Sequence, residues 1–252
     1  MSYHKTIIIL DWDDTLFPTH WLVENKINLN DPKVRSKYKY SFNRLDGIMS
    51  KFLIKCMQYG TVIVITNALP VWVNIALDVL PFTSKLFKYI RVVSARKMFQ
   101  NQSENMMDWK LKAFKYEISN KINKKNKLFN IISIGDAEYE YRALIGLHTW
   151  NKNQKKILKS IKLIKDPSIN DLYDELTVLY NAIGHVCKHR GFIDWNFQKI
   201  PEGEQNNQEL QVLQELEIQQ NQQQQKKFDM FEGYQEKGQQ EYQEYNPYQD
   251  DD

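Results

Sequence analysis

The chain has 252 residues, of which 42% are hydrophobic, and this length suits one domain of about 200 residues with an appendage. It contains no stretch of about 18 consecutive apolar residues, so we expect no membrane-spanning segment and no membrane partner. The first predicted strand starts near Lys5, which leaves no room for a cleavable presequence, and the two cysteines lie far apart in the sequence. We therefore expect a cytoplasmic protein with reduced thiols.

The net charge of +3 hides an uneven distribution of charge along the chain. Residues 1–200 contain 31 basic and 18 acidic side chains, whereas residues 201–252 contain three basic and 13 acidic ones. A basic body favours anionic substrates such as a phosphoprotein or nucleic acid, although a Lys-rich surface also serves solubility alone. The change in composition at Pro201 predicts a domain at residues 1–200 followed by a separate tail.

The tail has the composition of a low-complexity segment. Fifteen of the residues in 201–252 are glutamine, and apolar side chains are sparse, which predicts a disordered, acidic, Gln-rich C-terminal tail. Its one apolar cluster could dock onto a protein partner, or the tail could have no function. This cluster consists of Phe228, Met230, Phe231 and Tyr234.

The hydrophobic pattern predicts strands that alternate with helices as far as residue 189. In chain order we predict a strand at Thr6–Leu10, a loop with one helical turn at Thr15–Tyr40, a helix at Ser41–Tyr59, a strand at Thr61–Ile65, a helix at Pro70–Leu80, a strand at Tyr89–Val93, a loop at 96–107, a helix at Met107–Ile122, a strand at Phe129–Ile134, a helix at Ala137–Ile145, an edge strand at 157–164 and a helix at 169–189. Such alternation predicts an α/β fold in which helices cover both faces of a central parallel sheet.

Three carboxylates follow the first predicted strand directly. The stretch IIILDWDDTL places Asp11, Asp13 and Asp14 after four apolar residues, at the edge where open α/β sheets bind ligands. Asp11 and Asp13 are two residues apart, so in extended chain they project to the same side. Because two close carboxylates repel each other, a divalent cation with oxygen ligands would relieve the conflict. The sequence therefore predicts a Mg²⁺ site here, although a solvated acidic turn is the simpler alternative.

Two further predicted strands end in polar residues of the same kind. Thr66 and Asn67 follow the second strand, and Asp136 follows the strand at Phe129–Ile134. A lysine, Lys110, lies near the start of the helix before that strand. Because adjacent parallel strands end at one edge, we expect these groups to meet there.

This order of motifs resembles the haloacid dehalogenase (HAD) superfamily, chiefly its phosphatases, over about residues 5–146 and further towards 189. The family's DxDx[T/V] motif is matched by Asp11, Asp13 and Thr15, its Thr or Ser after an apolar strand by Thr66, and its last acidic motif by Asp136 in IISIGD. Its lysine is matched by Lys110, with Lys97 as the rival. The chain departs from the family at Glu140, where a second aspartate is common.

The resemblance implies a role for each matched residue. Asp11 would be the nucleophile that forms an aspartyl-phosphate, and Asp13 the general acid and base. Thr15, Thr66 and Asn67 would hold the substrate, and Lys110 would offset its charge. Mg²⁺ would be bound by Asp11, the backbone carbonyl of Asp13, and Asp136, with Glu140 behind Asp136 and not directly on the ion. Asp14 is expected to brace the loop.

The predicted segments between the motifs are too short to hold a cap domain with its own core. We therefore expect a capless, three-layer Rossmann-like HAD fold with an open site, which suits a bulky phosphorylated substrate such as a protein side chain. The substrate class stays open at this point. Two alternatives remain, namely a catalytically silent scaffold or interaction subunit of the same fold, and a nucleic-acid 3′-phosphatase. Nucleic acid is the less favoured partner because no nucleic-acid-binding module accompanies the domain.

Overall fold

The structure is a computed structural model that describes residues 5–121, 128–151 and 155–199. All of these residues belong to the unit Met1–Lys199. The acidic tail predicted at 201–252 lies outside the described residues, so its disorder and its docking role stay predictions.

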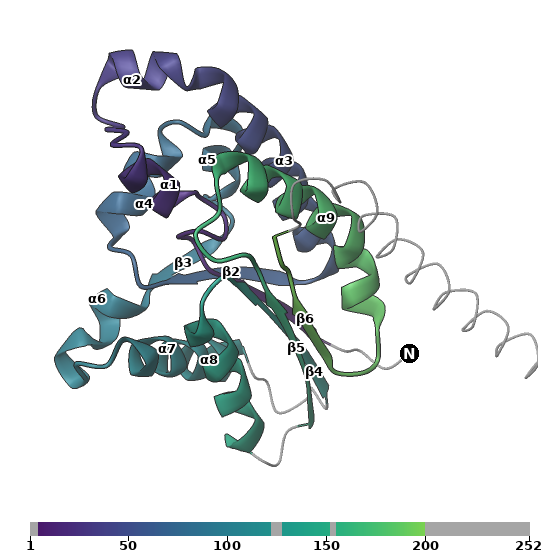
Figure 1. Ribbon diagram of the computed structural model, residues 1–252. Helices are drawn as coiled ribbons and strands as arrows, with labels where there is room; N and C mark the ends of the chain where they lie inside the picture. Colours follow the sequence, from purple (N-terminus) through teal and green to yellow (C-terminus); the bar gives the residue numbers. More distant parts are fainter. Residues whose placement is uncertain (1–4, 122–127, 152–154, 200–252) are drawn as a thin grey trace, which may run out of the picture. The chain divides into compact units, whose positions relative to one another are not determined.

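A parallel sheet organises the described residues (Figure 1). Its six strands lie in the order β3-β2-β1-β4-β5-β6, and every neighbouring pair is parallel. The strands are β1 (Lys5–Leu10), β2 (Thr61–Thr66), β3 (Arg91–Ser94), β4 (Leu128–Gly135), β5 (Lys155–Lys162) and β6 (Ile193–Asn196). The prediction of an α/β fold with a central parallel sheet is confirmed.

Strand β1 lies inside the sheet, between β2 and β4, and its side chains are buried on both faces. Ile8 and Leu10 belong to the apolar core on one face of the sheet, and Ile7 and Ile9 belong to the core on the other face. All four side chains are at most 1% exposed. A continuous β-branched and aliphatic run is what a strand covered by helices on both sides requires.

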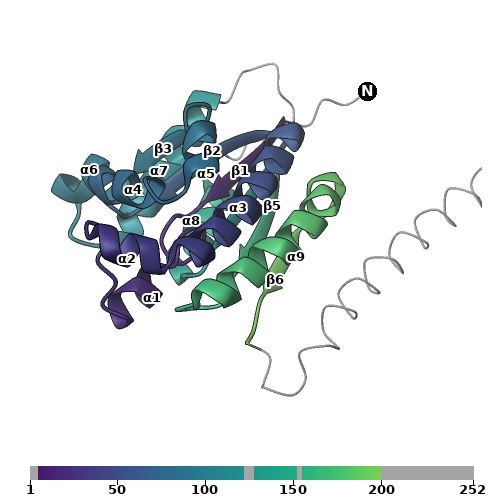
Figure 2. The same ribbon diagram turned by 90° about the horizontal axis from the view of Figure 1, so that it is seen from above.

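The helices form one layer on each face of the sheet. Helices α3 and α9 lie side by side on one face, and α7 packs against α8 on the other (Figures 1 and 2). The helices are α1 (Thr19–Glu24), α2 (Pro32–Lys37), α3 (Lys39–Tyr59), α4 (Pro70–Leu77), α5 (Pro81–Leu86), α6 (Ala95–Phe99), the 3₁₀-helix η1 (Gln100–Gln102), α7 (Met106–Lys121), α8 (Glu138–Thr149) and α9 (Ile169–Lys188). Within the sheet, the strand order places the carboxyl ends of β1, β2 and β4 next to one another.

Three short helices replace predicted loop or helix-end residues. Helix α2 lies within the predicted loop Thr15–Tyr40, and α6 begins at Ala95 and covers the start of the predicted loop at 96–107. Helix α5 begins at Pro81, where the sequence predicted only the end of the preceding helix. The reason lies in α3, because the buried carboxylate of Asp46 accepts the backbone N–H groups of Phe82 and Thr83 at 2.8 Å each. This carboxylate satisfies donors that a helix start leaves unpaired.

Residues 157–164 were predicted to form an edge strand; a strand is present, β5, but its predicted place at the edge of the sheet is wrong. Strand β6, which the sequence analysis missed, pairs with β5 on its outer side, with Lys159 opposite Ile193. Lys159 is fully buried, and its Nζ donates to the carbonyl oxygens of Val186 (2.5 Å) and His189 (2.6 Å) at the end of α9. The buried ammonium group of Lys159 thus satisfies the last carbonyl oxygens of a helix.

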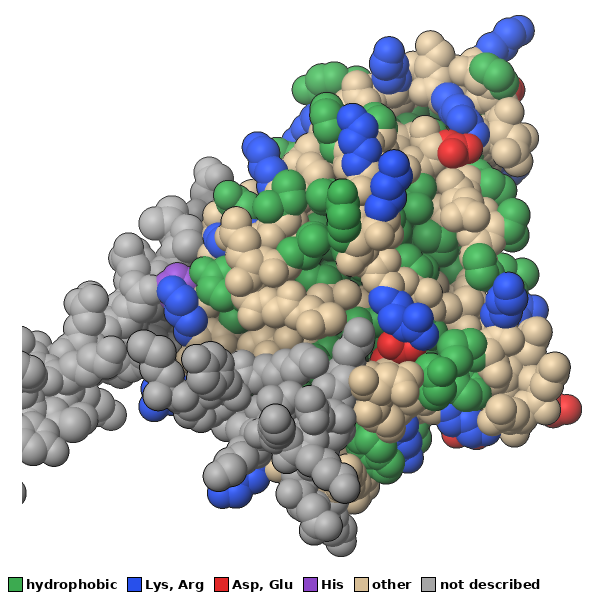
Figure 3. Space-filling view, turned by 180° about the vertical axis from the view of Figure 1, so that it is seen from behind, with side chains coloured by type: hydrophobic (Ala, Val, Ile, Leu, Met, Phe, Trp, Pro, Cys, Tyr) green, Lys and Arg blue, Asp and Glu red, His purple; other side chains and the backbone are tan. Residues whose placement is uncertain are grey.

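One face of the domain carries many Lys and Arg side chains and few acidic ones (Figure 3). This agrees with the excess of basic residues in residues 1–200. Among the described residues, no helix combines the length and the hydrophobicity needed to cross a membrane.

Candidate active site

The polar residues after β1, β2 and β4 meet at the carboxyl edge of the sheet, as the sequence predicted. Leu10 pairs with Val64 of β2 and with Ile134 of β4. The backbone N–H of Asp11 still donates to the Ile134 carbonyl oxygen at 3.0 Å, so the ladder extends to the first acid. The direction of the Asp11 side chain is thereby fixed by the two neighbouring strands.

Lys110 of α7 is the cation of this site. Its side chain is 1% exposed, and its Nζ lies 2.5 Å from Asp11 Oδ1 and 2.6 Å from Glu140 Oε1. It also donates to the Ile65 carbonyl oxygen at 2.8 Å. Lys97, the rival in the sequence analysis, lies exposed on α6. The structure therefore brings Lys110, and not Lys97, to the acidic residues.

Asp11, Asp136 and Glu140 form a buried acidic cluster. One carboxylate oxygen from each lies within 4.8 Å of the others. Glu140 Oε2 is buried and has no hydrogen-bond partner among the described residues. Gly135 makes room for this side chain, because a Cβ at that position would lie 2.4 Å from Glu140 Cγ. Three converging carboxylates of which one oxygen is unpartnered form an arrangement that a divalent cation would complete.

The electrostatics of the cluster favour the arrival of a cation. Burial raises the pKa of Asp11 well above its ordinary value; Lys110 opposes that rise, and the neighbouring carboxylates add to it. Burial, followed by the negative charges of Glu140 and Asp14, raises the pKa of Asp136 to about 7. Burial opposes the charge of Lys110, but Asp11 and Glu140 raise its pKa above the ordinary value. The lysine is therefore charged at neutral pH, and a single positive charge faces three carboxyl groups.

Hydroxyl and indole donors surround the carboxylate of Asp13. Its Oδ1 accepts hydrogen bonds from Thr19 Oγ1 (2.6 Å) and from Trp72 Nε1 (2.9 Å), and its Oδ2 lies 3.4 Å from Thr66 Oγ1. The sequence analysis missed Thr19 and Trp72. Thr19 lies four residues after Thr15, but no signal within the sequence links Trp72 of α4 to the first motif.

The other predicted residues lie close to the cluster in different roles. The Thr15 hydroxyl accepts the Asp136 N–H at 3.1 Å and donates to Asp136 Oδ1 at 3.4 Å, so it supports Asp136. Asn67 Oδ1 is buried without a hydrogen-bond partner among the described residues. Contacts of Thr15, Thr66 and Asn67 with a substrate stay predictions, as does a metal contact from Asp13.

Asp14 braces the loop, as predicted. Its backbone has a φ of 54°, in the left-handed region that aspartate tolerates better than most residues. Its Oδ1 accepts the backbone N–H of His20 in the first turn of α1 at 2.8 Å. The loop that carries Asp13 is thus tied to the helix that carries Thr19.

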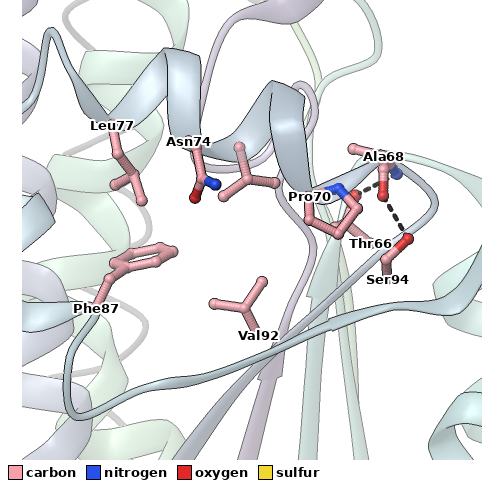
Figure 4. Close-up of a pocket in the computed structure, with 9 residues that line it drawn as sticks. Thr66, Ala68, Pro70, Asn74, Leu77, Phe87, Val92 and Ser94 are labelled. Carbon is pink, nitrogen blue, oxygen red and sulfur yellow. Dashed lines mark hydrogen bonds between the residues drawn. The ribbon is translucent and has the colours of Figure 1, made fainter. Parts of the chain in front are cut away.

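A pocket of about 210 Å³ lies beside Thr66, between α4 and the edge of the sheet (Figure 4). In Figure 4, Leu77 and Asn74 of α4 lie above the pocket, and Phe87 and Val92 lie below it. The hydrogen bond from Ser94 to the Ala68 carbonyl oxygen (2.7 Å) lies at one end. The lining residues are Thr66, Ala68, Pro70, Val73, Asn74, Leu77, Phe87, Val92 and Ser94.

Comparisons with protein-family models, with curated proteins and with solved structures found no match. The candidate site therefore has to be interpreted from its own geometry. Its distinguishing features are two acids at the tip of one strand, a buried lysine, and two further acids after a neighbouring strand.

Proposed function

We propose that this chain is a Mg²⁺-dependent phosphatase of the HAD superfamily that hydrolyses a phosphomonoester through an aspartyl-phosphate. The observation that carries the proposal is the buried contact of Lys110 Nζ with Asp11 and Glu140, beside Asp136. These residues come from three separate segments of the chain, and their convergence is what the resemblance to the HAD motifs implies.

The donor set suits a hard divalent cation. It consists of carboxylate oxygens, and Mg²⁺ takes oxygen ligands at about 2.1 Å in octahedral geometry, so opposite ligands lie about 4.2 Å apart. The three carboxylate oxygens lie within 4.8 Å of one another. Three octahedral ligands include at least two adjacent pairs about 3.0 Å apart, so the side chains would draw closer together around the ion. Asp11, Asp136 and Glu140 would hold the ion, which would supply charge stabilisation at the phosphoryl oxygens. Glu140 is thereby a candidate for direct binding as well as for the supporting position that the sequence suggested.

Lys110 prepares Asp11 for nucleophilic attack. In the first step, a carboxylate oxygen of Asp11 forms a bond to phosphorus while the bond to the leaving oxygen breaks. The ammonium group on Asp11 Oδ1 fixes the orientation of the carboxylate and offsets the negative charge of the phosphoryl group. Because the lysine also bonds to the Ile65 carbonyl oxygen, its position is set by β2 and not by the acids alone.

Asp13 is placed to exchange protons with the leaving group and then with water. It donates a proton to the leaving oxygen as the phosphorus–oxygen bond breaks. In the second step it takes a proton from a water molecule, whose oxygen bonds to phosphorus as the bond to Asp11 breaks. The aspartate thus returns to its starting state in each cycle, and the products are inorganic phosphate and an alcohol.

The segments around the site favour a bulky substrate. Between Thr15 and β2 the chain forms α1, α2 and α3, and between Asn67 and α7 it forms α4, α5, β3, α6 and η1. No second sheet is present among the described residues. A capless site of this kind would admit a phosphorylated protein side chain, which is the substrate class that we propose.

The proposal is tested by assaying the full chain with p-nitrophenyl phosphate. We expect turnover in the presence of Mg²⁺, loss of turnover with chelator, and loss of turnover in Asp11→Asn while that variant remains folded. A variant of an exposed site, Lys97→Met, serves as the control that keeps full activity. A stably folded wild type with no turnover on any phosphoester, with any divalent metal, would overturn the proposal and favour the silent scaffold.

A further inference from the structure

The carboxylate of Asp13 is held in an asymmetric set of hydrogen bonds. Two donors, Thr19 Oγ1 at 2.6 Å and Trp72 Nε1 at 2.9 Å, converge on Oδ1. The two donors also lie 3.3 Å from each other. Among the described residues, Oδ2 has only the longer approach of Thr66 Oγ1, at 3.4 Å. One oxygen is therefore occupied by the protein, and the other is the freer of the two.

The indole of Trp72 is held in place by aromatic packing. Its ring lies edge-to-face against Phe17, with centroids 6.0 Å apart and an interplanar angle of 70°. Phe17 is fully buried and stacks on Trp12, the residue between Asp11 and Asp13. The donor is thus fixed by the same aromatic cluster that supports the loop of the two acids.

The chemistry of the indole determines which oxygen of Asp13 can carry a proton. An indole N–H donates a hydrogen bond and cannot accept one. Oδ1 therefore has to remain an acceptor, and a proton on Asp13 is confined to Oδ2. The Thr19 hydroxyl also donates a short hydrogen bond to Oδ1, which further favours a proton on Oδ2.

We propose that Trp72, together with Thr19, is a positioning residue that dedicates Oδ2 of Asp13 to proton transfer. This inference rests on the proposed phosphatase function. In the step concerned, the proton on Oδ2 moves to the leaving oxygen, which keeps the electron pair of the breaking phosphorus–oxygen bond. Without the indole, the carboxyl group can rotate and place its proton away from the leaving group.

The consequence is a dependence on the leaving group. An alkoxide leaving group needs a proton as the bond breaks, whereas p-nitrophenolate leaves with little help. In Trp72→Phe, which keeps an aromatic ring against Phe17, we expect kcat/KM for O-phosphoserine to fall about 30-fold and for p-nitrophenyl phosphate only about 3-fold. A purely structural defect would lower both values by the same factor.

One control variant and a pair of Thr19 variants complete the test. Trp21→Phe changes a tryptophan of α1 that packs edge-to-face on Tyr38 and does not bond to Asp13, and we expect an unchanged ratio of the two substrates. Thr19→Val removes the second donor and should shift the ratio in the same direction as Trp72→Phe, whereas Thr19→Ser restores the hydroxyl and should restore the ratio. The Thr19 pair supplies the test if Trp72→Phe does not fold.

The outcomes separate the inference from the function on which it rests. Equal losses on both substrates, or no loss in either Trp72→Phe or Thr19→Val, would overturn the positioning role while leaving the phosphatase proposal intact. A wild type that hydrolyses neither substrate would overturn the proposed function and this inference with it. A selective loss on O-phosphoserine in both variants, with recovery in Thr19→Ser, would support it.

Discussion

Replacing Asp136 by asparagine should remove one large contribution to the pH dependence of stability in the metal-free protein. The pKa of Asp136 rises from its ordinary 3.8 to about 7 on folding, mainly through burial and the charge of Glu140. A raised carboxyl pKa means that the folded protein holds the proton when the unfolded chain has lost it. Stability is therefore complete below pH 3.8 and is lost as pH rises towards 7. At about 1.4 kcal/mol for each pKa unit, the loss is roughly 4 kcal/mol.

Asparagine has nearly the same shape and cannot ionise. Its carbonyl oxygen can still accept the hydrogen bond from Thr15, which approaches Asp136 Oδ1 at 3.4 Å. In chelator at about pH 8, Asp136→Asn should be more stable than the wild type by a few kcal/mol, up to roughly 4, and at about pH 4 the two should be similar. Mg²⁺ at about 100 times its Kd should add roughly 2.7 kcal/mol to the wild type and far less to the variant.

Urea unfolding followed by tryptophan fluorescence measures the free energy of unfolding of each protein, in chelator at both pH values and with Mg²⁺. Asp78→Asn is the matched control, because Asp78 is exposed and only faces Arg35 across 3.6 Å. That control should follow the wild type within about 0.5 kcal/mol under each condition. The reasoning is refuted if Asp136→Asn gains as much from Mg²⁺ as the wild type does and shows no advantage at the higher pH.

Two further predictions concern the space and charge around the cluster. Lys110→Met leaves the buried carboxylates without their cation, so we expect a loss of about 3 to 5 kcal/mol in unfolding free energy near neutral pH and no measurable turnover; Lys97→Met should change neither, and equal behaviour of the two variants would contradict the role of Lys110. Gly135→Ala places a methyl group 2.4 Å from Glu140 Cγ. The apparent Kd for Mg²⁺, measured from the stabilisation of the protein in thermal unfolding, should rise at least about tenfold. Gly47→Ala is the matched control, because a Cβ there meets no atom within 4 Å; it should stabilise α3 by up to about 1 kcal/mol. If Gly135→Ala responds to Mg²⁺ as the wild type does, Glu140 does not reach the ion.

The long elements of the fold could be predicted from the sequence because each carries its own periodic signal. The apolar runs of β1, β2 and β4 and the amphipathic pattern of α3 and α9 appear where they were expected. The short elements depend on partners elsewhere in the chain. Helix α5 begins where Asp46 of α3 accepts its first N–H groups, and β6 has four residues that become a strand only beside β5. No local pattern contains that information.

The same distinction applies to the site. Asp11 and Asp136 were predicted because strand ends in a parallel sheet converge at one edge, which is a property of the topology. For the lysine, the order of motifs favoured Lys110 and left Lys97 open, and the fold decides for Lys110. Trp72 was missed because its role depends on how α4 packs against Phe17, and the helical pattern alone indicates only that this residue lies on α4. Glu140 lies beside Asp136, where the sequence predicted it, and it fills the space that Gly135 leaves.

The placement of β1 between β2 and β4 has a consequence for biosynthesis. β1 is made first, yet one of its two neighbours, β4, ends at Gly135, and at 5–20 residues per second the intervening chain takes roughly 6 to 25 s to emerge. During that interval an isoleucine-rich strand has one open side and could pair with another nascent chain. We therefore expect that translational pausing between residues 66 and 128 would lower the yield of native protein, whereas pausing after residue 199 would not.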